Sequence, residues 1–413
     1  MAQQTMIKRK TLFQSKTTFA LFCAILFLSA QFCCAQNANI QTGADQTQLY
    51  LPLLKGKNVG MVVNQTSVIG SKNVSSVDSL LKRGIKIKRV FGPEHGFRGN
   101  ASNGAKVGDE VDPKTGINIV SLYGAKRKPS KSDLDSVDVM VFDIQDVGCR
   151  FYTNINTLGD VMEACAEFGK ELIILDRPNP NAYVDGPVLD MKLKSGVGKY
   201  PIPILHGMTI GEFAKMINGQ CWLPNNAQCK IRVIPVKNYK HDMAYTLPVN
   251  PSPNLNTQQS VLLYPSLCLF EGTTVSQGRG TYMPFTVLGS PYLKGTYDFT
   301  FTPVSIPGKS ETPLYQNQVC YGLDLRNYNT ETLRKSGKIN LKWIMDLFNA
   351  YPDKAKFFDR KQSKQIGNID FLAGVSAFKE QISAGKTEQE IRQSWEPGLS
   401  EYKLMRKKYL LYK

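Results

Sequence analysis

The alternation of short apolar runs with amphipathic stretches between residues 57 and 176 constrains the fold of this chain more than any other feature. Several runs have the length and β-branched character of strands, and other stretches have helical spacing. We predict strands over residues 59–64, 87–91, 117–122, 137–143 and 172–176, and helices over residues 74–83 and 158–168. Strands that alternate with helices form βαβ units, in which the strands lie parallel. The pattern therefore predicts an α/β fold built on a mostly parallel sheet.

The character of the sequence changes at about residue 260. Glycine- and proline-rich loops follow, with helical patterns at residues 341–351 and 371–384, which fit a smaller α+β domain better than a continued parallel sheet. We place the join in residues 250–254 (NPSPN) and expect domains at residues 36–258 and 259–413. The basic, tyrosine-rich segment 401–413 indicates a docking helix with a charged outer face.

Residues 1–35 have the layout of a secretory signal peptide. Four cations precede an apolar run over residues 19–30 and a small-residue exit at residues 33–35. That run is too short for a permanent membrane helix, and no later segment approaches the ~20 apolar residues required. We therefore expect an exported protein, periplasmic or secreted. A lipoprotein anchor on Cys33 or Cys34 ranks second, because Phe32 is bulky where a lipidation box needs a small residue.

The chain is still basic without this leader. Its formal charge falls from +17 to +13, because the leader holds four cations and no acid. Positive charge favours an anionic partner such as a cell-wall polymer or a lipid surface. Nucleic acid is not expected, because export argues against it and the cations are scattered rather than clustered with aromatics.

Metal and cofactor signatures are missing from the sequence. None of the cysteines after residue 35 forms a CxxC pair, and only three histidines occur, so neither a metal nor a cofactor is expected. Cys221 and Cys229 are the nearest couple, which alone does not establish a disulfide. No complete GxGxxG, Walker-type loop, GxSxG or HExxH motif is present, and Met283 stands where the last glycine after Gly278-Arg279-Gly280 would belong.

Four of the predicted strands end in polar residues. The clusters are residues 64–66, 93–95, 143–146 and 176–180. Strand ends of a parallel sheet lie at one edge, outside which open α/β sheets bind ligands. We therefore expect the four clusters to converge on one cleft.

The segment 92–99 (GPEHGFRG) places an acid, a base and a cation between glycines. Glu94 is a candidate general acid, whose pKa a partly apolar cleft beside Phe97 would raise. The alternative, and the commoner outcome for an isolated glutamate, is a turn carboxylate paired with Arg98. The glycine and proline frame favours function, because it aims the side chain. His95 would support Glu94 or bind a substrate hydroxyl, with a structural histidine equally open.

Asp143 and Asp146 form a second group of candidates, with Arg150 and Tyr152 close behind. Two carboxylates suit acid/base work on a glycosidic bond. In the structural alternative, Asp143 caps the next helix and Asp146 pairs with Arg150. The two interpretations are evenly balanced.

Two arginines are candidates for carboxylate recognition. Arg177 and Arg279 present forks suited to bidentate binding, and glycines on both sides of Arg279 favour close approach of a ligand. Either could instead clamp a loop. Glu271 is a further carboxylate of undecided role. His206 precedes a predicted helix that Thr209 would cap, and capping does not explain the histidine.

The succession of these motifs resembles the exo-β-N-acetylmuramidases, a bacterial family formerly known as a domain of unknown function. The matching segments, in the family's order, are residues 92–99, 143–153, 175–180, 203–212, 250–254 and 264–285, and the resemblance extends through residues 409–412. It covers nearly all of the mature chain. A succession of this kind is far more specific than any single motif.

The resemblance implies a Rossmann-like N-terminal domain, a smaller C-terminal domain and a cleft between them. It also implies removal of N-acetylmuramic acid from the non-reducing end of peptidoglycan fragments in cell-wall turnover. The arginines then gain a purpose, because the lactyl group of that sugar carries a carboxylate. On this basis Glu94 protonates the glycosidic oxygen, and its partner is Asp143, Asp146, Glu271 or the substrate's own 2-acetamido group.

The expected site follows from these motifs and the resemblance. The catalytic set is Glu94, His95, Asp143 and Asp146, and the substrate-binding set is Arg98, Arg150, Tyr152, Arg177, Asn179, His206, Asn254, Glu271 and Arg279. Two other classes compete with a glycosidase. One is a cell-wall binding protein without turnover, and the other is a nucleotide-dependent oxidoreductase, which only the sheet type supports.

Overall fold

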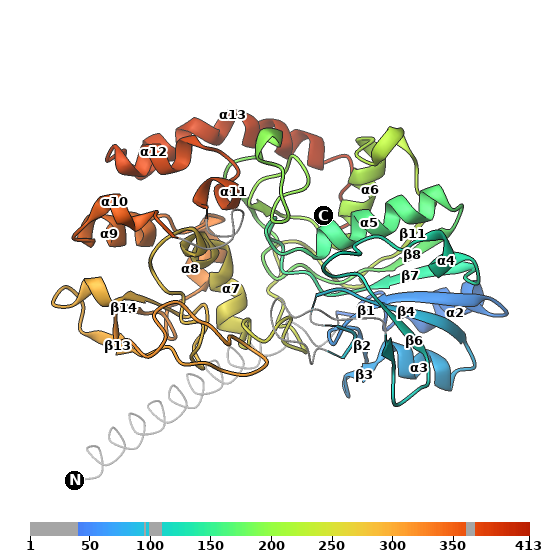
Figure 1. The fold of residues 1–413 in the computed structure, drawn as a ribbon. Coiled ribbons are helices and arrows are strands. Elements are labelled where there is room, and N and C mark those ends of the chain that lie inside the picture. Colours follow the sequence, from blue (N-terminus) through green and yellow to red (C-terminus); the bar gives the residue numbers. More distant parts are fainter. Residues whose placement is uncertain (1–39, 95, 99–109, 361–367) are drawn as a thin grey trace, which may run out of the picture.

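The computed structural model describes residues 40–94, 96–98, 110–360 and 368–413, which form two halves (Figure 1). One half is built on a parallel sheet and extends to about residue 257. The other half follows it in the chain and combines helices with a small antiparallel sheet. The predicted leader, residues 1–35, lies outside the described residues.

A seven-stranded sheet organises the first half. Its order is β11 (Ile231–Ile234), β8 (Glu171–Leu175), β7 (Val139–Asp143), β1 (Asn58–Val63), β4 (Lys86–Gly92), β6 (Asn118–Ser121) and β5 (Glu110–Val111). Only β5, at the edge, pairs antiparallel. Counted along the chain, the parallel strands follow the 3-2-1-4-5-6 order of Rossmann folds. The predicted α/β, Rossmann-like class is therefore confirmed, and the order reverses between β1 and β7.

Alternating side chains give the sheet two apolar faces. In β1, Met61 and Val63 pack on one side, beneath α2 (Thr47–Leu54) and α3 (Ser76–Lys82), whereas Val62 packs on the other. That second face is covered by α4 (Lys131–Leu134), α5 (Asn154–Glu167) and α6 (Ile210–Gly219). Burial on both faces explains why the strands appear in the sequence as nearly continuous apolar runs.

The predicted elements of this half occur within a few residues of their expected bounds. All five predicted strands are present, as β1, β4, β6, β7 and β8. The predicted helix over residues 74–83 is shorter, because its first residues form β3 (Val74–Ser75), which pairs with β2 (Val68–Ile69). Thr209 caps α6 as predicted, accepting a hydrogen bond from the Glu212 amide at 3.3 Å.

The second half is α+β, as predicted. Its antiparallel sheet has the order β12 (Val287–Ser290), β14 (Cys320–Asp324) and β13 (Phe299–Phe301), and its helices are α7 (Gln258–Leu267), α8 (Glu331–Ser336), α9 (Lys342–Ala350), α10 (Lys354–Phe357), α11 (Ile369–Ala373), α12 (Ala377–Ser383) and α13 (Glu388–Arg406). The single helix predicted over residues 371–384 is two helices, because Gly374 has φ 82° and ends α11. Short remaining elements are η1 (Met191–Leu193), η2 (Pro224–Asn226), η3 (Cys268–Gly272), η4 (Pro291–Leu293) and the pair β9 (Val184–Asp185) and β10 (Leu205–His206).

The segment after α13 returns to the sheet half and binds two buried acids there. Helix α13 runs from one half toward the other (Figure 1), and Tyr402 donates to the His206 carbonyl at 2.7 Å. The helix ends at Arg406, so the docking helix expected over residues 401–413 is only partly helical. Beyond it, the Leu411 amide donates to Glu212 Oε1 at 2.7 Å and the Tyr412 hydroxyl to Asp176 Oδ2 at 2.5 Å. Leu411 lies beyond the end of the helix, so its amide makes no intrahelical bond and is available to Glu212.

The described cysteines are all free thiols, including Cys221 and Cys229, the nearest couple in the sequence. Cys221 is exposed whereas Cys229 is buried. Cys229 instead hydrogen-bonds with Cys165, which together with burial raises the pKa of Cys165 well above its ordinary value. Within the described ranges, no helix combines the length and apolar character needed to cross a membrane.

Candidate active site

A cavity of about 390 Å³ lies between the two halves, and both contribute side chains to it. We call it the central cavity. The sheet half supplies Asn64, Glu94, Tyr152, Thr153 and Asn154, and the second half supplies Glu271, Arg279, Lys309, Glu311 and Arg360 among others. The predicted join also lines it, through Pro251, Ser252 and Asn254. The cavity therefore combines the end of strand β4 with loops that lie far away in the sequence.

Glu94 reaches the central cavity from a tight turn after β4. A Cβ on Gly92 would lie 3.0 Å from the Phe97 amide nitrogen, so the turn leaves little room for a side chain at that position. Gly96, with φ 73°, closes the turn by donating its amide to the Pro93 carbonyl at 3.0 Å. Glu94 therefore stands in a tight turn, between two glycines, and lines the central cavity.

Two tyrosines face Glu94. Burial raises the pKa of Tyr123 to about 12, and the Glu94 carboxylate adds to that rise. Burial raises the pKa of Tyr152 well above its usual range, with the charges of Asp146 and Glu94 contributing. The Tyr152 hydroxyl donates to the Pro251 carbonyl at 2.9 Å. Both phenols therefore stay protonated around the acid. His95, the other catalytic candidate of this segment, lies outside the described residues.

Arg98 points away from the central cavity and binds protein carboxylates. Its Nε and Nη2 donate to the two oxygens of Asp112 at 2.8 and 2.7 Å. These bonds hold the pKa of Asp112 down, at about 2. The competing interpretation of Arg98 as a partner of Glu94 is wrong, because its fork is taken by Asp112, and a role in substrate binding has no support in this geometry.

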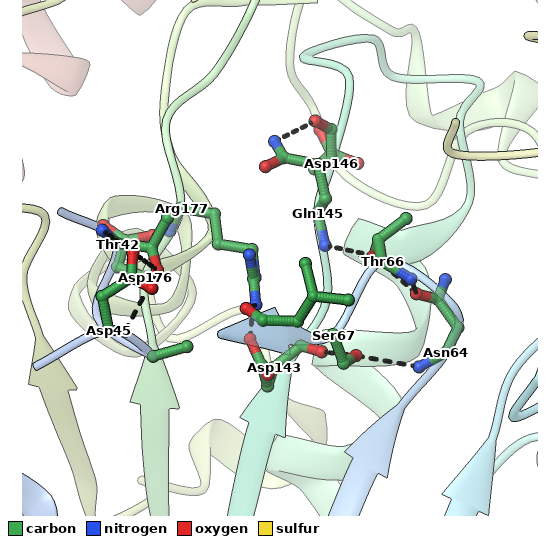
Figure 2. Close-up of polar contacts among 12 residues, drawn as sticks. Thr42, Asp45, Asn64, Thr66, Ser67, Asp143, Gln145, Asp146, Asp176 and Arg177 are labelled. Atoms are coloured by element: carbon green, nitrogen blue, oxygen red, sulfur yellow. Dashed lines mark hydrogen bonds and ion pairs between the residues drawn. The ribbon is translucent and has the colours of Figure 1, made fainter. Parts of the chain in front are cut away.

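The strand ends of β1, β7 and β8 join in a buried hydrogen-bond network (Figure 2). Arg177 Nε donates to Asp143 Oδ1 at 2.7 Å, and the Gln145 amide donates to Thr66 Oγ1 at 3.0 Å. Ser67 donates to the Asp143 carbonyl. We call these five residues, with Asn64, the strand-end network. Three of the four predicted polar strand ends therefore meet, but in a buried network. The expected convergence of all four on one cleft is wrong, because Glu94 of the fourth strand end lines the central cavity, which Asp143 and Arg177 do not reach.

The strand-end network occupies the point where the strand order reverses. In Rossmann enzymes a dinucleotide binds in the crevice outside this point. Here the side chains of Arg177 and Asp143 are 1% and 0% exposed, and Arg177 also donates to the Val68 carbonyl at 2.9 Å. Asp143 and Arg177 therefore do not line the central cavity, and their charges are taken up by one another. This geometry gives the oxidoreductase alternative no support.

Asp146 and His206 form a buried pair beneath the cavity loops. The Gly148 amide donates to Asp146 Oδ2 at 2.7 Å, and His206 Nε2 lies 3.6 Å from the same oxygen. The Met208 amide donates to His206 Nδ1 at 3.2 Å, which places the proton of a neutral ring on Nε2, facing Asp146. Neither residue lines the central cavity. The alternative pairing of Asp146 with Arg150 is wrong.

Arg150 and Asn179 bind backbone carbonyls. Arg150 is fully buried and donates to the carbonyls of Pro187, Ile202, Leu372 and Ala373, at 2.7 to 2.9 Å. Asn179 donates to the Met208 carbonyl at 3.0 Å. Asp143 does not cap the following helix, whose cap position is Thr153. These contacts hold the loops together and leave Arg150 and Asn179 without access to a ligand in the central cavity.

The opposite wall of the central cavity carries the pair Arg279 and Glu271. Arg279 Nε and Nη2 both donate to Glu271 Oε1, at 2.7 and 2.6 Å, and the guanidinium lies 4.9 Å from the centre of the Phe285 ring. Gly278 and Gly280 have φ of 77° and 80°, so the backbone turns sharply on both sides of the arginine. Arg279 is therefore anchored by Glu271 and lines the central cavity.

Several polar groups of the cavity were not predicted, Arg360 and Lys309 among them. Arg360 donates to the Glu271 carbonyl at 3.0 Å, and its Nε has no hydrogen-bond partner among the described residues. Burial lowers the pKa of Arg360, partly offset by the Glu271 charge. Lys309 and Asn64 also line the cavity. Arg360 and Lys309 stand in loops without a motif, so the sequence offered no signal for them.

Of the predicted site residues, five line the central cavity: Glu94, Tyr152, Asn254, Glu271 and Arg279. The described residues contain no cluster of three or more histidine, cysteine or acidic side chains suited to a metal ion. What the cavity offers is one framed carboxyl group on the sheet side and two guanidinium groups on the other. That combination suits an acid-catalysed reaction on an anionic substrate.

Comparisons with known proteins agree with this geometry. Residues 59–259 match the family model described as "Exo-beta-N-acetylmuramidase NamZ, N-terminal", and residues 262–412 match its C-terminal counterpart. The chain is 39% identical to the peptidoglycan beta-N-acetylmuramidase NamZ of Bacillus subtilis (strain 168), over 98% of this chain and 100% of that protein.

Two solved structures share the fold. Both are Bacteroides fragilis proteins of a family defined as a domain of unknown function. They are 44% and 28% identical to this chain, with TM-scores of 0.82 and 0.77, and each comparison covers 91% of this chain and 99% of the other. With both family models matched along nearly its whole described length, the chain belongs to the exo-β-N-acetylmuramidases, a family of glycoside hydrolases.

Proposed function

We propose that this protein releases N-acetylmuramic acid from the non-reducing end of peptidoglycan fragments, with Glu94 as general acid. The observation that carries the proposal is the central cavity, which places Glu94 on one wall and Arg279 on the other, in a chain of this family. Glu94 protonates the glycosidic oxygen as the bond to the anomeric carbon breaks. The N–H groups of Arg279 that do not bind Glu271 hold the lactyl carboxylate.

Arg360 contributes to the same anion site. Its guanidinium is largely desolvated, and among the described residues its Nε lacks an acceptor. A buried donor without an acceptor is costly, so a carboxylate in the cavity would stabilise it. Arg279 and Arg360 together therefore distinguish a sugar with a lactyl group from a neutral one.

The second catalytic group is the substrate's 2-acetamido oxygen. Asp143 and Asp146 lie behind the cavity and are engaged by Arg177 and the Gly148 amide. Glu271 lines the cavity, but one of its oxygens accepts both Arg279 bonds. With these carboxylates held by protein groups, an internal nucleophile is the simpler partner for Glu94. Turnover should then fall steadily along a substrate series with mono-, di- and trifluorinated acetamido groups, whereas Glu271 acting as nucleophile would leave the rate nearly level.

Product analysis tests the activity itself. The purified protein is incubated with a disaccharide of N-acetylmuramic acid linked β-1,4 to N-acetylglucosamine, and the products are identified by mass spectrometry. We expect free N-acetylmuramic acid and N-acetylglucosamine in equal amounts, and none from the reversed disaccharide, in which N-acetylglucosamine is terminal. Intact disaccharide that remains bound to the protein would instead establish a cell-wall binding protein without turnover.

We also propose that the protein is exported and acts in the periplasm or outside the cell. The signal-peptide layout of residues 1–35 supports this. The amino terminus of the protein isolated from cells should start near Gln36. A lipid-modified cysteine at that terminus would establish the anchored alternative.

A further inference from the structure

Tyr282 is the most exposed large hydrophobic side chain in the described part of the chain. It is 79% accessible to solvent. An aromatic ring of this size stabilises a fold when buried, so its exposure offers the fold little. Tyrosine is enriched at binding interfaces, because its ring is apolar and its hydroxyl group is polar.

The loop that carries Tyr282 is held rigidly. The Thr281 amide and hydroxyl both bond to the Gly278 carbonyl, at 3.1 and 2.6 Å. The Val304 amide donates to the Gly280 carbonyl at 2.8 Å. This is the same loop that fixes Arg279. Tyr282 is therefore presented to solvent by an ordered backbone, and binding a ligand there costs little loop entropy.

Tyr282 lies next to a residue of the cavity wall. Lys309, which lines the cavity, places its Nζ 5.6 Å from the centre of the Tyr282 ring. The Lys309 carbonyl accepts a hydrogen bond at 3.0 Å from Asn254, another cavity residue. Glu311 and Thr312, which follow Lys309 on the cavity wall, are exposed to solvent. The cavity therefore opens to solvent along residues 309–312, beside the tyrosine ring.

We propose that Tyr282 is the stacking platform for the sugar on the leaving side of the scissile bond. The inference rests on the proposed function. A cavity of about 390 Å³ is near the lower end of the ~300–1,000 Å³ of ligand pockets, which fits one substituted sugar rather than a glycan chain. An exo-acting enzyme that holds the terminal sugar inside must leave the next sugar at the mouth.

The chemistry of the ring suits that position. A pyranose presents a face of C–H groups, whose slightly positive hydrogens are attracted to the negative face of an aromatic ring. Lys309 approaches the ring as a cation, and the large exposed area of Tyr282 leaves room for a sugar. Stacking needs no specific hydrogen bond, so the platform accepts leaving saccharides of different length.

Replacing the ring tests the proposal. In the variant Tyr282→Ala, we expect the KM for the disaccharide to rise about fivefold, the size of one lost aromatic contact. The inhibition constant of free N-acetylmuramic acid, which binds inside the cavity, should stay unchanged. Tyr282→Trp keeps an aromatic face and should keep the KM of the wild type. Tyr292→Ala is the matched control, because Tyr292 is also an exposed tyrosine, at 59%, and it packs against Tyr315 and Tyr351, neither of which lines the cavity.

Each outcome decides the matter. An unchanged KM in Tyr282→Ala overturns the platform, and so does an equal rise in KM and in the inhibition constant, since that would show a disturbed cavity. If the wild-type protein releases no N-acetylmuramic acid, the proposed function fails and the platform with it. If the wild-type protein cleaves the disaccharide and Tyr282→Ala has the same KM, the stacking role of Tyr282 is wrong and the proposed function stands.

Discussion

Two arginine–carboxylate pairs of equal bond length have different surroundings. In both Arg177–Asp143 and Arg279–Glu271 the arginine Nε lies 2.7 Å from a carboxylate oxygen. The first pair is enclosed, with side-chain exposures of 1% and 0%, and the second is open to the central cavity, at 20% and 10%. Arg177 gives a further donor to the Val68 carbonyl, whereas Arg279 lines the central cavity. The two ion pairs therefore differ in their surroundings rather than in bond length, and only the second stands where a ligand could reach it.

Breaking the enclosed pair should have the largest effect, and it should appear in stability. Arg177→Met leaves the Asp143 carboxylate buried without its counter-charge, so the free energy of unfolding should fall by about 3–5 kcal/mol. Urea unfolding followed by circular dichroism measures this. The control is Arg326→Met, which breaks an exposed pair with Asp324 and should change nothing measurable. If the Arg177→Met variant loses turnover but keeps the stability of the wild type, the assignment of Arg177 to the fold is contradicted.

Replacing Glu94, the acid of the central cavity, should lower turnover and leave stability unchanged. In Glu94→Gln the shape stays and the proton donor is lost, so kcat should fall by about two orders of magnitude or more. The unfolding midpoint should match that of the wild type. Glu110→Gln, an exposed substitution on β5, serves as the control. Near-normal turnover of Glu94→Gln on a chromogenic N-acetylmuramic acid glycoside would remove Glu94 from its assigned role.

The open pair should govern specificity rather than stability. Arg279→Gln removes charge-assisted bonds to the lactyl carboxylate, so kcat/KM for the muramic acid substrate should fall about tenfold or more. Activity on the matching N-acetylglucosamine glycoside, which lacks the carboxylate, should not fall. Arg360→Gln should shift the same ratio in the same direction. An equal loss on both glycosides would mean that Arg279 only holds the cavity wall.

The smallest expected effect is on stability, in a variant of Arg98. Like Arg177, Arg98 forms an ion pair with a carboxylate of the protein. Arg98 lowers the pKa of Asp112 from its ordinary 3.8 to about 2, so this pair stabilises the fold above pH 3.8 and loses that contribution as the pH falls toward 2. Arg98→Met should therefore lower the free energy of unfolding by about 1 kcal/mol at pH 7, because the arginine is partly exposed. The gap to the wild type should close in urea titrations near pH 2. If Arg98→Met changes the KM and the stability shows no such pH dependence, Arg98 binds the substrate rather than stabilising the fold.

The sheet and its polar edge could be predicted because periodicity is a local property. Runs such as residues 137–143 carry their own signal, and the parallel order places their ends together. The role of Arg150 could not be predicted, because its acceptors include the carbonyls of Leu372 and Ala373, more than two hundred residues away in the chain. The role of Arg360 could not be predicted for the same reason, because only folding brings it to the Glu271 carbonyl. Sequence thus identified the framed groups, Glu94 and Arg279, and missed those defined by distant partners.

The return of the segment after α13 has a consequence for the order of folding. Glu212 and Asp176 belong to the sheet half, yet they accept hydrogen bonds from Leu411 and Tyr412. A growing chain makes its N-terminal part first, so the sheet half exists for a time with these buried acids short of donors. It reaches its final stability only after the second half has been made and has folded. The two halves should therefore unfold together, in one cooperative transition, although each has its own sheet.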